Sequence, residues 1–146
     1  MGGIYSGSGG IMEAITAFSF LTPQESWRQT YFGTTTNTGD AADLFDFDKD
    51  GLVNLLEFAL GLNPTLGSSN QIPQGQINGS NFVISFTQPA GVTGITYGAE
   101  WSTTLSSNPL DWTNITDSDP SPTGYIFSVP IGGNQAVFIR LMVTSP

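Results

Sequence analysis

The sequence predicts a mostly β chain with a small helical part, and two observations lead to that prediction. Beyond residue 80, apolar residues alternate with polar ones, as in half-buried strands, and turn-forming residues separate the alternating stretches. Before residue 66, the apolar spacing and the flanking residues are typical of short helices. Between these two regions lies a stretch rich in Gly, Ser, Asn, Gln and Pro.

Several short strands are expected in the region beyond residue 80. The clearest alternation of apolar and polar residues runs through two of them, whereas the last is apolar on both faces and is therefore expected to be central in its sheet. Strands of this length and spacing predict an antiparallel β-sandwich of the immunoglobulin or fibronectin type III kind. The expected strands are 82–87, 95–102, 111–115, 124–129 and 136–144.

Two helices are expected ahead of the strands. Residues 22–25 read TPQE, which is a capping box with proline in the first helical position, and this helix should end near Gly33. The second helix has the sequence NLLEFAL and should end at Gly61, just before an Asn-Pro pair. Both helices are short, so the sandwich is expected to supply most of the fold.

The first twenty residues are harder to interpret, because a Gly/Ser-rich head is followed by an apolar segment that suits either a strand or a short helix. Ile11, Ile15 and Phe18 have helical spacing, while Phe18 and Phe20 have the spacing of a strand. The expected organisation is a head with an apolar segment, a helix-loop-helix module, a linker and the sandwich, at residues 1–20, 21–65, 66–80 and 81–146.

The most informative motif lies between the two expected helices, where residues 46–57 read DFDKDGLVNLLE. A twelve-residue loop can bind Ca²⁺ through oxygens at positions 1, 3, 5, 7, 9 and 12, with glycine at position 6 for the sharp turn. This sequence has acids at positions 1, 3, 5 and 12, and Gly51 at position 6. The predicted ligands are Asp46, Asp48, Asp50, the backbone carbonyl of Leu52, Asn54 and Glu57.

A simpler interpretation is a solvated acidic turn, which is the usual meaning of two aspartates at alternate positions. The complete spacing is more specific, and aspartates held together by a glycine turn would repel one another by roughly 1 kcal/mol per pair without a cation. Mg²⁺ suits the loop less well because it prefers a small octahedral shell with retained water. The sequence therefore predicts Ca²⁺ as the bound cofactor.

The stretch from ESWRQTYFG to FALGLNPT resembles a module near the C-terminal end of large secreted or surface proteins of Verrucomicrobia and Planctomycetes. The resemblance covers roughly residues 21–146, is dense between 25 and 65, and implies a β-rich tail after the loop. It also implies the ligand set given above. The loop itself resembles EF-hand, dockerin and thrombospondin type 3 calcium loops, although a dockerin would need a second such loop.

Composition argues against several classes of function. The sequence contains no cysteine and no histidine, which removes the usual general base and transition-metal ligands, so we expect no enzyme. The net charge is −9 with only three basic residues, which makes nucleic acid an unsuitable partner. The sequence contains no run of eighteen apolar residues, so no membrane span is expected. The opening MGGIYSGSGG lacks the basic start of a signal peptide.

The expected function is that of a noncatalytic, calcium-stabilised structural module of an extracellular or cell-surface protein. One alternative is a self-assembling subunit of an extracellular filament, in which residues 4–20 are donated as a strand to a neighbouring copy. Another is a carbohydrate-binding module, with Tyr97, Trp101, Trp112 and Tyr125 as a stacking platform. The expected partners are copies of the chain or other domains of a longer parent chain.

Overall fold

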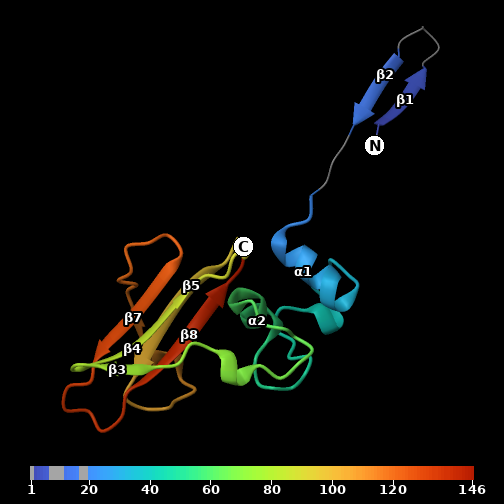
Figure 1. Ribbon diagram of the computed structural model, residues 1–146. Coiled ribbons are helices and arrows are strands. Elements are labelled where there is room, and N and C mark those ends of the chain that lie inside the picture. Colours follow the sequence, from blue (N-terminus) through green and yellow to red (C-terminus); the bar gives the residue numbers. More distant parts are fainter. Residues whose placement is uncertain (1, 7–11, 17–19) are drawn as a thin grey trace.

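The computed structural model describes residues 2–6, 12–16 and 20–146, and these form a β-rich fold with a few short helices (Figure 1). The helices are α1 (Pro23–Phe32), α2 (Asn54–Leu60) and the 3₁₀ turns η1 (Gly39–Ala41), η2 (Ser69–Gln71) and η3 (Pro109–Asp111). The strands are β1 (Gly2–Ser6), β2 (Met12–Thr16), β3 (Gln76–Asn78), β4 (Asn81–Thr87), β5 (Thr96–Ser102), β6 (Thr113–Ile115), β7 (Gly124–Pro130) and β8 (Phe138–Thr144).

Two antiparallel sheets account for the strands beyond residue 75. One has the order β3-β4-β7 and the other has the order β6-β5-β8. Each strand that the sequence predicts beyond residue 80 is present, and the prediction of a mainly β, antiparallel fold with a small helical part is confirmed. Glu100 of β5 lies opposite Arg140 of β8 and forms a salt bridge with it at 2.6 Å.

The prediction that residues 136–144 form a central strand is wrong. β8 begins at Phe138 and lies at the end of its sheet, where β5 is its only strand neighbour among the described residues. Its apolar character has another cause, because α2 lies beside it (Figure 1). Leu56 and Leu60 of α2 line a small cavity together with Ile139 and Leu141 of β8.

Aromatic side chains from both sheets meet in the core. Tyr97 of β5 lies 5.4 Å from Phe86 of β4 and 4.7 Å from Tyr125 of β7, measured between ring centroids. Phe127 lies beside Phe86 and Tyr125 and is only 1% exposed. Burial, with a smaller contribution from Tyr125, raises the pKa of Tyr97 to about 12, so its hydroxyl remains a hydrogen-bond donor.

The Tyr97 hydroxyl connects the sheets to the helical region. It donates a buried hydrogen bond of 2.6 Å to the backbone carbonyl of Ala59 in α2. On the other side of α2, Phe58 contacts Trp27 of α1, with 5.7 Å between ring centroids. Helix α2 therefore packs between α1 and the strands, and its position depends on both.

Helix α1 has the ends that the sequence predicts. Thr22 is the N-cap, its side chain accepts from the Glu25 backbone N–H, and the Glu25 carboxylate accepts from the Thr22 backbone N–H. Gly33 ends the helix at φ 71°, a left-handed conformation that glycine adopts without steric cost. Helix α2 likewise ends at Gly61, with φ 68°.

Residues 66–80, which the sequence predicts as a linker, are more ordered than that word implies. They contain η2 and β3, and Ser68 is only 1% exposed. Side chains at 72 and 73 also line the small cavity between α2 and β8. The stretch is thus packed between the helical region and the sheets.

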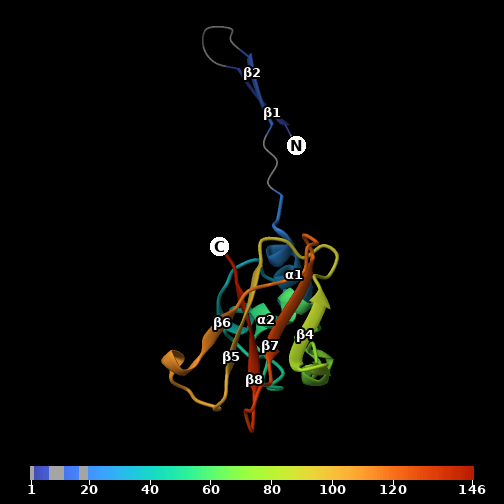
Figure 2. The same ribbon diagram turned by 90° about the vertical axis from the view of Figure 1, so that its left-hand side faces the viewer.

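The N-terminal segment forms a hairpin of its own. Strands β1 and β2 pair antiparallel with each other, from Gly2 opposite Thr16 to Ser6 opposite Met12. For residues 12–16 the strand alternative is therefore correct, while Ile11 and Phe18 fall outside the described residues. Figures 1 and 2 both show this hairpin apart from the other elements.

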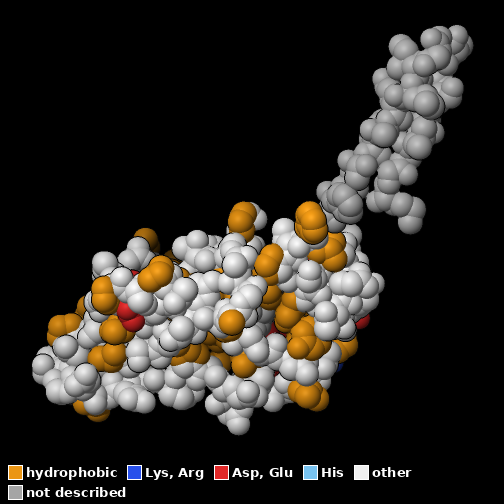
Figure 3. Space-filling model, turned by 45° about the horizontal axis from the view of Figure 1, so that its top comes forward, with side chains coloured by type: hydrophobic (Ala, Val, Ile, Leu, Met, Phe, Trp, Pro, Cys, Tyr) orange, Lys and Arg blue, Asp and Glu red, His pale blue; other side chains and the backbone are white. Residues whose placement is uncertain are grey.

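The surface beyond residue 19 is mostly neutral and polar, with scattered hydrophobic side chains and few charges on the face shown in Figure 3. Exposed apolar residues include Leu44, just before the acidic stretch, and Leu66, which lies beyond the end of α2. Within residues 2–6, 12–16 and 20–146, no helix has the length and apolar character needed to cross a bilayer.

Candidate metal centre

The acidic stretch forms a tight loop between η1 and α2. Lys49 and Gly51 have positive φ values of 63° and 95°, which curl the backbone back on itself. Backbone N–H groups then hold the side chains, since Gly51 donates to Asp46 at 2.9 Å and Asp50 donates to Asp48 at 3.1 Å. The loop thereby turns its carboxylates toward one another.

The two ends of the loop are fastened together by backbone hydrogen bonds. The Asn54 N–H donates to the Phe45 carbonyl at 2.9 Å, and the Leu55 N–H donates to the Asp43 carbonyl at 3.0 Å. These bonds fix where the loop starts and ends relative to α2. The predicted ligand positions are consequently held by backbone geometry as well as by side chains.

The structure brings the aspartates of the loop together. Asp46, Asp48 and Asp50 each offer a carboxylate oxygen, and these oxygens lie within 4.8 Å of one another. Asp46 Oδ1 and Asp48 Oδ2 are buried and accept no hydrogen bond from the described part of the chain. Buried polar atoms normally have partners, so these two oxygens are available to a cation.

Glu57 approaches the same cluster from the first turn of α2, with no exposed surface. Its Oε1 accepts from the Ser68 hydroxyl at 3.2 Å, whereas its buried Oε2 has no partner among the described residues. Burial raises the pKa of Glu57 to about 7, and Asp48, Asp50 and Asp46 add to the rise by repulsion. A cation at the cluster would remove that repulsion.

Asn54, which the sequence predicts as a ligand, has a structural role through its amide nitrogen. The side chain is fully buried, and Nδ2 donates to the backbone carbonyls of Asp40 and Ala42 at 2.8 Å each. These bonds tie the start of α2 to η1. Asn54 Oδ1 is buried and finds no partner among the residues described, so it keeps a free acceptor.

Leu52 occupies the predicted carbonyl-ligand position. Its side chain is 8% exposed, and its backbone N–H donates to Asp50 Oδ1 at 2.9 Å. The role of its carbonyl as a ligand stays a prediction, and so does that of Asn54. The chemistry of the cluster is clear nonetheless, because carboxylate oxygens are the ligands that hard divalent cations prefer. The aspartate triad could hold a metal ion.

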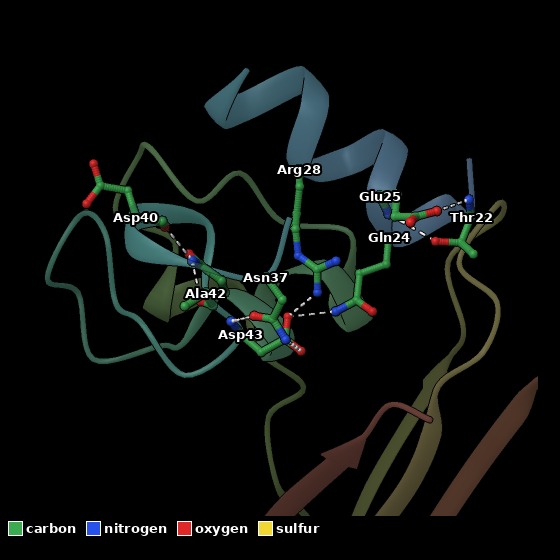
Figure 4. Close-up of polar contacts among 9 residues, drawn as sticks. Thr22, Gln24, Glu25, Arg28, Asn37, Asp40, Ala42 and Asp43 are labelled. Carbon is green, nitrogen blue, oxygen red and sulfur yellow. Dashed lines mark hydrogen bonds and ion pairs between the residues drawn. The ribbon is translucent and has the colours of Figure 1, made fainter. Parts of the chain in front are cut away.

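A second polar cluster, centred on Asp43, lies beside the loop and was not foreseen from the sequence (Figure 4). Asp43 accepts from Arg28 at 2.5 Å, from Gln24 at 2.8 Å and from Asn37 at 2.9 Å. Arg28 is 6% exposed, so a buried cation of α1 is matched by an acid just ahead of the loop. The cluster fixes α1 against the start of the loop.

Ser68 is the other residue that sequence reasoning missed. It lies beyond α2, and its backbone N–H donates to Asp50 Oδ2 while its hydroxyl donates to Glu57. No motif marks this serine, because its partners are eleven and eighteen residues away in the sequence. Only the fold brings it to the cluster.

The aromatic residues named as a possible sugar platform occupy different places. Tyr97 and Tyr125 belong to the aromatic core between the sheets. Trp112 lies under the guanidinium of Arg140, 4.3 Å from ring centroid to Cζ, and its indole N–H donates to the Ser106 carbonyl. The four rings therefore do not form one exposed plane.

Comparison of the chain with protein-family models, with curated protein sequences and with solved structures finds no match. The functional argument therefore rests on the geometry of the loop, the buried carboxylate of α2 and the packing of the helices on the sheets.

Proposed function

We propose that this chain is a noncatalytic structural module in which a calcium ion fixes the helical region against the β-sheets. The observation that carries the proposal is Glu57, which is fully buried with one unpartnered oxygen beside a triad of aspartates. Like charges gathered in a buried place are costly unless a cation joins them. In this role Asp46, Asp48, Asp50 and Glu57 hold the ion.

Calcium fits the donor set better than other common cations. The cluster offers carboxylate oxygens, the predicted Leu52 carbonyl and Asn54 amide oxygen would add to them, and Ca²⁺ accepts six to eight such ligands at about 2.3–2.6 Å. The sequence has no cysteine or histidine for a softer metal. A single loop of this kind suits millimolar calcium, which supports an extracellular or cell-surface location for the module.

The proposed architecture is an immunoglobulin-like or fibronectin type III-like sandwich with the calcium loop packed at one side. Support comes from the sheet orders β3-β4-β7 and β6-β5-β8 and from the aromatic contacts between the sheets. The hydrogen bond from Tyr97 to Ala59 supports a bracing role, because it ties α2 directly to a strand. Calcium would then hold a fixed arrangement rather than open a groove.

Calorimetric titration tests the calcium site. We expect one Ca²⁺ to bind per chain, and the melting temperature to rise by about 5–10 °C at calcium concentrations near 100 times Kd. Asp111→Asn changes an exposed acid outside the cluster, so it is the control and should bind calcium as the unaltered chain does. Absence of binding by the unaltered chain at millimolar calcium would reject the proposal.

A second candidate function is self-assembly, and the β1–β2 hairpin favours it. A two-stranded sheet is marginally stable by itself and presents unpaired edges to any neighbouring strand. We propose that, if the module assembles, this hairpin pairs with a sheet edge of another copy, such as β8, which is the end strand of its sheet.

A further inference from the structure

Ser68 lies where the chain, having left α2, returns to the acidic loop. It is 1% exposed and is among the largest fully buried side chains, together with Asn54 and Glu57. Its backbone N–H donates to Asp50 Oδ2 at 2.5 Å, and its hydroxyl donates to Glu57 Oε1 at 3.2 Å. One serine thus contacts acids from both the start and the end of the candidate metal centre.

The usual structural role for a serine at this position does not explain the contacts. Ser68 precedes η2 as its N-cap residue, yet no side-chain cap hydrogen bond is formed in this turn. The turn is closed by the backbone instead, since the Gln71 N–H donates to the Ser68 carbonyl at 2.7 Å. The hydroxyl is therefore directed to Glu57 rather than to the helix end.

Both contacts set the orientation of the carboxylates. The Ser68 N–H donates to Asp50 Oδ2 and so fixes the position of that carboxylate oxygen. The Ser68 hydroxyl donates to Glu57 Oε1, while Glu57 Oε2 has no hydrogen-bond partner in the described part of the chain. A buried carboxylate held by one oxygen has little freedom to rotate.

The segment that follows Ser68 reaches the strands. Ile72 and Pro73 line a cavity of about 200 Å³ together with Leu56 of α2, Ile84 of β4 and Ile139 of β8. Residues 68–73 therefore run from the carboxylates to the place where α2 meets both sheets. If Ser68 is held less tightly, residues 69–73 should also be held less tightly against α2 and the sheets.

We propose that Ser68 is a positioning residue for the cation site, and that through it cation binding fixes residues 66–73 against the sheets. The inference rests on the proposed calcium site. It adds a residue from outside the 46–57 loop, which orients Asp50 and Glu57 without contacting the ion itself. It also gives the ion an effect beyond the loop and α2.

Ser68→Ala tests the hydroxyl, and Ser69→Ala is the matched control. Ser69 is the same residue type one position later, it is exposed, and alanine keeps its backbone N–H. We expect Ser68→Ala to weaken calcium binding about tenfold, as loss of a group that orients a ligand commonly does. Titration well below the melting temperature, on the full chain, gives the affinity, and Ser69→Ala should match the unaltered chain.

A spectroscopic signature separates positioning from simple stabilisation. Tb³⁺ replaces Ca²⁺ in oxygen sites, and its luminescence lifetimes in H₂O and D₂O count the waters on the bound ion. If Glu57 loses its orientation in Ser68→Ala, additional water should enter the shell. Hydrogen exchange gives the second signature, because calcium should protect amides 66–72 in the unaltered chain and do so less in Ser68→Ala.

The outcomes distinguish the two proposals. If the unaltered chain binds no calcium, the proposed function and this inference both fall. If it binds calcium and Ser68→Ala shows the same affinity, the same terbium hydration and the same protection of residues 66–72, only the role of Ser68 falls. Weaker binding with additional water on terbium, against an unchanged Ser69→Ala, supports positioning.

Discussion

At the scale of single residues, Glu57 is the acid of the cluster whose ionised form is most disfavoured by its surroundings. It is fully buried, it faces three aspartates, and its pKa is raised to about 7 because the ionised form is poorly solvated and repelled. Without a cation its charge destabilises the fold, whereas with a cation the same charge is needed.

Replacing Glu57 with glutamine should have opposite effects in the two states. In chelator, Glu57→Gln should melt at the same temperature as the unaltered chain or higher, because it removes a buried charge beside other acids. In calcium, it should melt lower, since a ligand is lost and most of the calcium-dependent rise disappears. Thermal unfolding with EDTA and with calcium measures both effects. A fall of equal size in both conditions would mean that Glu57 has only a packing role.

The pH dependence of the cation-free chain should reflect the same group. In the unfolded state Glu57 ionises near 4.5, but in the folded state it keeps its proton to about pH 7. Stability is therefore greatest below pH 4.5 for this group and declines as pH rises to 7, by about 2–3 kcal/mol. Urea unfolding in EDTA measures the free energy of unfolding at each pH. The difference between the unaltered chain and Glu57→Gln separates the contribution of Glu57 from that of the other acids. A difference that stays flat over this range would contradict the raised pKa.

At the scale of elements, α1 depends on the Asp43 cluster. Arg28 of α1 is buried and has its charge matched by Asp43, so removal of the acid would leave an unpaired cation. We expect Asp43→Ala to lower the free energy of unfolding by about 2–4 kcal/mol. Glu25→Gln is the control, because the glutamine would keep the solvent-exposed capping hydrogen bond through its amide oxygen. A loss below about 0.5 kcal/mol for Asp43→Ala would show that the pair is solvent-screened.

The elements also show what local sequence can predict. The ends of α1 and α2 follow from Thr22, Gly33 and Gly61, because caps act over a few residues. The loop spacing predicted that Asp46, Asp48 and Asp50 would gather, since they lie within five residues of one another, while the ligand role of Glu57 stays a prediction. The place of β8 at a sheet end and the contact of Ser68 could not be predicted, because each depends on partners distant in the sequence.

At the scale of the whole molecule, the β1–β2 hairpin stands apart from the domain formed by residues 20–146 (Figure 1). Deleting residues 1–19 should therefore leave the melting temperature of the remainder within about 2 °C. If the hairpin mediates assembly, the same deletion should abolish oligomers seen by light scattering at high concentration with calcium. A truncated chain that melts much lower would show instead that the segment packs on its own domain, and a monomeric full-length chain would exclude the assembly role.

The hydrogen bond from Tyr97 to Ala59 has a consequence for how the molecule unfolds. It joins a strand in the middle of one sheet to a helix whose other side contacts α1, so no boundary in the chain separates two independent hydrophobic cores. A fragment of residues 81–146 would leave Ile84, Ile139 and Leu141 without the leucines of α2. We expect a single calorimetric transition for residues 20–146, with equal calorimetric and van't Hoff enthalpies. The helical region and the sheets would then gain and lose their structure together, as one cooperative unit.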